Sequence, residues 1–178
     1  MDLKLDLTFA RVVKEQIDDY VHAEVLFYPV GAVNGLQMPQ LTIGTWLETA
    51  WRLKAVQPDA PELAEAVAAV RRIHQRVPDL YDGKARREFK SRLDAWTLYL
   101  DDALQSKSST GYATQVHYRV KLELLKEDVS QLQEQLTRLK TLDARLKTRF
   151  KTGEFILDPE LAGAAPQEQL WWLWGSLD

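Results

Sequence analysis

Apolar residues recur at helical spacing along most of the chain. Between residues 7 and 27 they occupy one face of a helix, with charged residues opposite, which is typical of an amphipathic helix that packs on a core. Stripes of the same kind predict three further helices before residue 106. These helices span the segment from Thr42 or Thr45 to about residue 56, residues 60–76 and residues 84–105.

Proline and glycine mark the breaks between these helices. Residues 28–40 contain two prolines and two glycines, a density that predicts a loop. Asn34-Gly35 within this loop suits a tight turn, and a β-hairpin there is the less favoured alternative. Asp82-Gly83 predicts a second turn, directly before the helix over residues 84–105.

The longest uninterrupted pattern covers residues 112–152, where apolar residues follow a seven-residue repeat. Leucine, valine or an aromatic residue occupies every seam position from Tyr118 to Phe150 except Asp143. This pattern predicts a coiled-coil-like helix about 60 Å long. A short polar linker joins it to the helix before it, so we expect the two to form an antiparallel hairpin.

The predicted fold class is therefore all-α, an up-and-down bundle of about four to five helices. We expect one domain over residues 1–178, in which residues 1–111 form helices one to four, residues 112–152 form helix five and residues 153–178 form a C-terminal extension. A helix over residues 84–105 covers little more than half of the predicted helix over residues 112–152. The far half then needs cover from helices one to three or from a second chain, and we slightly favour a homodimer.

Composition bounds the function without naming it. The chain is 46% hydrophobic and 28% charged, with a net charge of −3 and no cysteine. These values predict a folded protein, disfavour a globally basic nucleic-acid binder and exclude disulfides and thiolate metal sites. The first residues lack the basic and apolar regions of a signal peptide, and no apolar run is long enough to span a membrane. We expect a soluble, cytoplasmic protein.

Histidine placement gives little support for a metal site. His22, His74 and His117 fall on three different predicted helices, and a bundle that directed all three inward could hold a divalent ion. None of the usual spacings, such as two histidines four residues apart on one helix, is present. The favoured interpretation is ordinary histidines, with no cofactor, and whether the protein is an enzyme is uncertain but not favoured.

A basic run occupies the far half of residues 112–152 and suggests an alternative function. Lysine and arginine side chains are sufficient to contact the phosphate groups of nucleic acid or anionic lipid. The other interpretation is that these cations stabilise a helix C-terminus and pair with acids four residues away, and this one is favoured. The candidate anion-binding residues are Arg138, Lys140, Arg145, Lys147, Arg149 and Lys151.

Tryptophan is concentrated near the C-terminus, where residues 166–177 also predict a short helix. Tryptophan is enriched at binding hot spots, so this helix could dock on a partner. The favoured alternative is that the tail folds back onto its own bundle. The candidate partner-binding residues are Leu139, Leu142, Leu146, Trp171, Trp172 and Trp174.

Together these features predict a non-catalytic protein with an interaction or structural role, most simply through self-association. A nucleic-acid-associated accessory protein is the second hypothesis, and a metal-dependent helical-bundle enzyme is the third.

Overall fold

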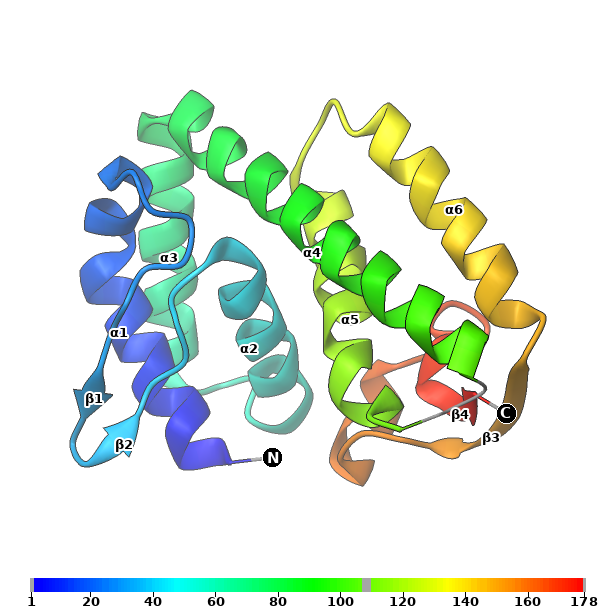
Figure 1. Ribbon diagram of the computed structural model, residues 1–178. Helices are drawn as coiled ribbons and strands as arrows, with labels where there is room; N and C mark the ends of the chain where they lie inside the picture. The colour runs from blue at the N-terminus through cyan, green and yellow to red at the C-terminus, as the bar shows by residue number, and fades with distance from the viewer. Residues whose placement is uncertain (1, 107–109, 178) are drawn as a thin grey trace.

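A computed structural model describes residues 2–106 and 110–177 of the chain and shows a mostly helical protein (Figure 1). The α-helices are α1 (Leu3–His22), α2 (Ile43–Val56), α3 (Pro61–Arg76), α4 (Pro78–Ser106), α5 (Tyr112–Asp128) and α6 (Gln133–Lys147). Two 3₁₀ helices, η1 (Pro159–Ala164) and η2 (Trp171–Leu173), follow near the C-terminus. The short strands are β1 (Ala32–Val33), β2 (Leu36–Gln37), β3 (Phe150–Phe155) and β4 (Trp174–Leu177).

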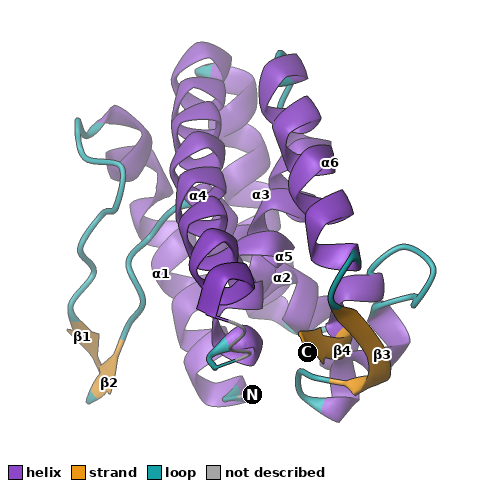
Figure 2. Cartoon of the chain, turned by 45° about the vertical axis from the view of Figure 1, so that its right-hand side comes forward, coloured by secondary structure: helices purple, strands orange, loops and turns teal. Residues whose placement is uncertain are grey.

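Helix α4 connects two halves of the molecule. One half contains α1, α2 and α3, and the other contains α5, α6 and the C-terminal segment (Figures 1 and 2). With 29 residues, α4 is about 44 Å long, so it contacts helices of both halves. The core is continuous between the halves and includes Phe9, Phe89 and Trp96, each at most 1% exposed. Within the described part of the chain, no helix is long and apolar enough to cross a membrane.

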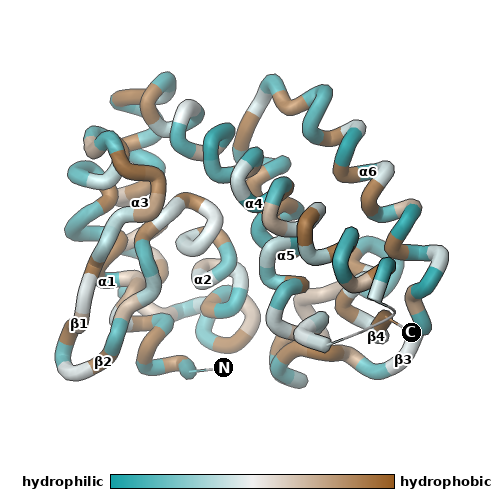
Figure 3. The backbone as a smooth tube through the Cα atoms, viewed as in Figure 1, coloured by the Kyte–Doolittle hydropathy of each residue, from teal (hydrophilic) through white to brown (hydrophobic). Residues whose placement is uncertain are grey.

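The prediction of one long helix over residues 112–152 is wrong. The chain leaves the helix at Val129, which is extended, and Gln131 adopts a left-handed backbone with φ of 66°. Helix α6 then runs back along α4 (Figure 1). The break has a physical advantage, because a straight helix would extend beyond α4 and leave its far leucines in water. Figure 3 shows hydrophobic and hydrophilic residues alternating along α6, as expected for a helix with one buried face.

The broken helix also removes the need for a second chain. Leu139, Leu142 and Leu146 are at most 4% exposed within this single chain. Asp143, the polar residue in the predicted seam, lies beside a buried arginine instead of in an apolar contact. Arg119 Nε and Nη2 donate to its two carboxylate oxygens at 3.0 and 2.9 Å. The seam leucines therefore pack inside the chain rather than against a partner.

The β-hairpin that was the less favoured alternative is present. Strands β1 and β2 pair antiparallel, with Val33 opposite Leu36. Asn34 and Gly35 supply the two positive φ angles, 50° and 77°, that a two-residue hairpin turn of this kind requires. The second predicted turn, Asp82-Gly83, is wrong. Both residues lie inside α4, which begins immediately after α3 at Pro78.

The C-terminal extension forms a strand where a helix was predicted. Strand β4 pairs antiparallel with β3, and Phe150 lies opposite Leu177. Gly175 makes this pairing possible, because a Cβ there would lie 2.0 Å from the Lys151 carbonyl oxygen. The described residues thus contain two small two-stranded sheets in addition to the helices, whereas the favoured prediction contained no sheet.

Candidate functional site

A cleft lies between the two halves and consists of two adjoining cavities, which we call the central cleft. The first cavity has a volume of about 440 Å³ and is lined by α1, α2, α5 and residues 156–161. The second has a volume of about 560 Å³ and is lined by α1, residues 37–40, α2, α4 and α5. Leu5, Asp6 and Arg52 line both cavities. The central cleft is therefore built from segments that lie far apart in the sequence.

Arg52 joins α2 to α1 at the boundary of the two cavities. Its Nε and Nη2 donate to the two carboxylate oxygens of Asp6 at 2.8 and 2.6 Å, and Nη2 also donates to the Thr49 hydroxyl. Such a two-point contact fixes the orientation of the guanidinium. Burial alone lowers the pKa of Arg52, but the hydrogen bond to Asp6 and the charges of Glu48 and Asp6 outweigh it and raise this pKa.

Glu48 lies one helical turn before Arg52 and joins α2 to α5. One carboxylate oxygen pairs with His117 Nδ1, and the other lies 2.5 Å from Lys121 Nζ. Burial by itself raises the pKa of Glu48, but the His117 hydrogen bond and the charges of Lys121 and Arg52 lower it to about 2. Because the carboxylate is ionised and can only accept, His117 Nδ1 carries the shared proton.

Glu88 from α4 sets the position of α2. Its carboxylate accepts from the Thr42 hydroxyl at 2.6 Å and from the Gly44 backbone N–H at 2.8 Å, where the positive end of the α2 dipole favours an anion. A Cβ at Gly44 would lie 2.7 Å from Glu88 Oε1, so glycine allows this close approach. Arg92 donates to the same oxygen from Nε and Nη2, both at 3.2 Å.

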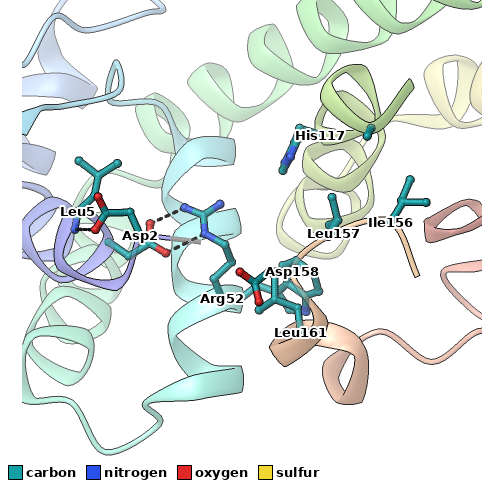
Figure 4. Close-up of a pocket in the computed structure, with 11 residues that line it drawn as sticks. Asp2, Leu5, Arg52, His117, Ile156, Leu157, Asp158 and Leu161 are labelled. Carbon is teal, nitrogen blue, oxygen red and sulfur yellow. Dashed lines mark hydrogen bonds and ion pairs between the residues drawn. The ribbon is translucent and has the colours of Figure 1, made fainter. Parts of the chain in front are cut away.

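Residues 156–161 form the wall of the first cavity opposite α1. Figure 4 shows Ile156 and Leu157 near His117, with Arg52 on the other side of the cavity. Two indoles fix the chain just after this segment. Trp51 Nε1 donates to the Ala164 carbonyl at 3.2 Å, and Trp174 Nε1 donates to the Ala165 carbonyl at 2.8 Å.

The structure keeps the three histidines apart. His22 on α1 is exposed and lies beside Asp18, while His74 on α3 contacts Asp82 and stacks on Tyr81 at 4.1 Å. His117 is the histidine that lines the central cleft. No group of three or more histidine, aspartate or glutamate side chains that could hold a metal ion occurs among residues 2–106 and 110–177.

Several of the predicted anion-binding cations hold α6 and its C-terminal end against α4. Arg138 pairs with Asp94 at 2.6 Å, Arg145 pairs with Asp101 at 2.7 Å, and Arg149 donates to the last carbonyls of α4. Lys147 lies 4.9 Å from the centre of the Trp171 ring, Lys140 is exposed, and Lys151 lies on β3. The basic run therefore has a structural role in holding α6 beside α4.

The predicted partner-binding tail is docked on its own chain. Trp172 is 2% exposed and its carbonyl accepts from the Tyr112 hydroxyl at 2.8 Å. The guanidinium carbon of Arg119 lies 3.7 Å from the centre of the Trp172 ring, an arrangement typical of a cation–π contact. Trp171 and Trp174 are half-buried against Phe150 and Phe155. Of the two alternatives, the structure agrees with the tail that folds back.

Sequence reasoning considered His117 only as a weak metal-site candidate and missed the other charged residues of the central cleft. A signal was present, because three pairs lie four residues apart on single helices. These pairs are Glu48 with Arg52, Glu88 with Arg92, and His117 with Lys121. On a surface helix the acid–arginine spacing of the first two pairs gives ordinary stabilisation, and only the tertiary structure reveals that the three pairs meet.

Comparison with known proteins gave no match: neither the family models, nor the curated proteins, nor the solved structures resemble the chain.

Proposed function

We propose that the protein is a non-catalytic binding protein and that its central cleft holds a small ligand with an apolar part. The observation that carries this proposal is the first cavity. Its volume of about 440 Å³ falls in the range of small-molecule sites, which are concave, largely apolar and carry a few fixed polar groups. Its apolar lining is Leu5, Trp51, Ile156, Leu157 and Leu161.

The polar groups of the first cavity favour binding over chemistry. Arg52 is fixed by Asp6, and His117 is fixed by Glu48, so both can orient a ligand without rearrangement. Proton transfer is most efficient when the pKa of the acid or base is near the working pH. Glu48 lines the second cavity and holds His117 of the first. With a pKa of about 2, it is far from that condition at neutral pH and serves better as a fixed anchor for His117.

Binding of a protein partner remains a prediction, but most of the residues predicted to contact the partner are not accessible. Leu139, Leu142, Leu146 and Trp172 are buried in the chain, so they are not free to contact a second protein. The accessible apolar surface of the first cavity is the stronger basis for a binding function.

Filling the first cavity tests the proposal. Ala113 is exposed on α5 and lines this cavity, so Ala113→Phe places a ring in it without removing a core contact. We expect the wild-type protein to bind the neutral fluorophore N-phenyl-1-naphthylamine, and Ala113→Phe to weaken binding at least tenfold. Thr114→Phe, at the exposed neighbouring position, is the matched control. Equal binding by both variants, or no binding by wild type, contradicts the proposal.

A further inference from the structure

The second cavity exposes more positive than negative charge, although its three cations pair with three carboxylates. Arg52, Arg92 and Lys121 pair with Asp6, Glu88 and Glu48, respectively. The three carboxylate side chains are 5%, 0% and 4% exposed, whereas the three cationic side chains are 20%, 15% and 12% exposed. The three carboxylates are thus more buried than the three cations, although Asp6 and Glu48 also line the cavity. Because Coulomb energy falls with distance, a ligand in the cavity interacts mainly with the cations.

The cations also retain hydrogen-bond donors. Lys121 has one carboxylate contact and three N–H donors. Arg92 uses Nε and Nη2 for Glu88, and the rings of Phe27 and Tyr118 lie 4.9 and 5.7 Å from its guanidinium carbon. Aromatic rings near a guanidinium hold it in place while its edge stays available for hydrogen bonds. Its Nη1 makes no hydrogen bond within the described residues.

We propose that the second cavity binds the anionic group, a carboxylate or a phosphate, of a small molecule through Arg52, Arg92 and Lys121. This inference rests on the proposed function, since the same ligand would place its apolar part in the first cavity. Arg52 lines both cavities and lies where the two parts of such a ligand would join. Guanidinium and ammonium groups are the usual partners of carboxylates and phosphates. Gln37, Gln40 and Thr45 add neutral polar groups to the lining.

Calorimetric titration with anions tests the inference. The probes are inorganic pyrophosphate and citrate, which carry the phosphate and carboxylate groups, respectively. We expect at least one to bind the wild-type protein at low salt and to bind more weakly as sodium chloride is added, because salt screens charges. Binding of pyrophosphate alone assigns a phosphate ligand, and binding of citrate alone assigns a carboxylate. Absence of binding by both overturns the inference.

Two substitutions locate the binding to the second cavity. We expect Arg92→Gln and Lys121→Gln each to weaken anion binding at least tenfold. Both variants should fold, since Glu88 keeps its hydrogen bonds from Thr42 and Gly44, and Glu48 keeps its hydrogen bond from His117 and its ion pair with Arg52. Lys90→Gln removes one charge from an exposed position of the same helix, α4, and should bind like wild type. Equal affinity in all three variants overturns the inference.

The two proposals fail independently. Binding of N-phenyl-1-naphthylamine without anion binding leaves the proposed function intact and removes the anion site. The opposite result is anion binding that Arg92→Gln abolishes, with no binding of the neutral fluorophore. It supports the anion site and contradicts the proposal that the first cavity binds the apolar part of the ligand.

Discussion

In the central cleft, the carboxylate of Glu48 is kept ionised by its neighbours. It is 3% exposed, yet three cationic or proton-donating side chains surround it. An ionised carboxylate in such a place is stable only while its partners remain, since an unpaired buried charge is costly. Charge and fold are therefore linked at this residue.

This linkage predicts the acid response of the fold. The pKa of Glu48 lies at about 2 against an ordinary value of 4.5, so the folded state holds the proton less tightly than the unfolded chain. Its contribution to stability is present in full above pH 4.5 and is lost as the pH falls through about 2. The size of that contribution is on the order of 3 kcal/mol. We expect Glu48→Gln to be less stable than wild type at pH 7, and the difference to shrink across this window.

Urea unfolding at a series of pH values measures the difference. Glu15→Gln, at an exposed position of α1, controls for the loss of a carboxylate and should follow the wild-type curve. A difference between Glu48→Gln and wild type that stays constant from pH 7 to pH 2 would contradict the link between charge and fold.

Residue identity alone could not reveal these side chains as a site. Glu88 is fully buried, but the charged residues around it, such as Arg87 and Lys90, are typical of an exposed helix surface. What distinguishes it is the Gly44 N–H that it accepts from, a partner 44 residues earlier in the chain. Such contacts depend on how α2 and α4 cross, and helical periodicity does not determine that crossing.

At the scale of elements, periodicity predicted the helices well and their ends less well. Helix α3 ends at Arg76, as Val77-Pro78 predicts, and Thr42 caps α2. The seven-residue repeat misled, because it continues through Val129 and Leu132 although both lie at the break. Both are buried there, at 9% and 3% exposed. These apolar residues could be buried in a straight helix or at a break between two helices. Their spacing therefore could not distinguish the two structures.

The break between α5 and α6 makes a prediction about Gln131. Its φ of 66° is unfavourable for a residue with a side chain and free for glycine. Because Gln131 is exposed, Gln131→Gly removes this strain and loses little packing. We expect the variant to be more stable by about 1 kcal/mol, measured as a rise in the thermal midpoint.

The neighbouring residue supplies a control of opposite sign. Ser130 is also exposed but has no positive φ, so Ser130→Gly adds only flexibility to the unfolded chain and should lower the midpoint. A fall in the midpoint of Gln131→Gly as well would show that the left-handed turn is not strained.

At the scale of the whole molecule, the C-terminal segment completes both the core and the cleft. Ile156 N–H donates to the Leu173 carbonyl at 3.0 Å, which connects the cleft wall to the buried Trp172-Leu173 pair. The mostly helical class could be predicted from sequence, since the regular structure of the described residues is helical apart from a few short strands. The cleft could not, because residues 156–161, which form one wall of its first cavity, come to lie opposite α1 only after α6 folds back and the tail docks.

Removing the tail should therefore affect the entire fold. Deleting residues 167–178 removes the burial of Trp172, Leu173 and Leu177, each at most 4% exposed. Buried side chains of this size contribute about 1.5 to 3 kcal/mol each, so the loss is roughly 5 kcal/mol or more, comparable to the stability of a typical domain. We expect thermal unfolding followed by circular dichroism to show a large fall in the midpoint. An unchanged midpoint would mean that the tail is only loosely attached.

The contact between Gly44 and Glu88 has a consequence for how this sequence can evolve. A side chain at position 44 would collide with the carboxylate of position 88, and a shorter residue at position 88 would leave the Gly44 N–H and the Thr42 hydroxyl without their acceptor. A change at either position alone therefore disrupts the contact, and a Cβ at position 44 would also lie 3.2 Å from Leu125 Cδ1. The residues at positions 44 and 88 therefore constrain each other, and we expect each position to tolerate few substitutions.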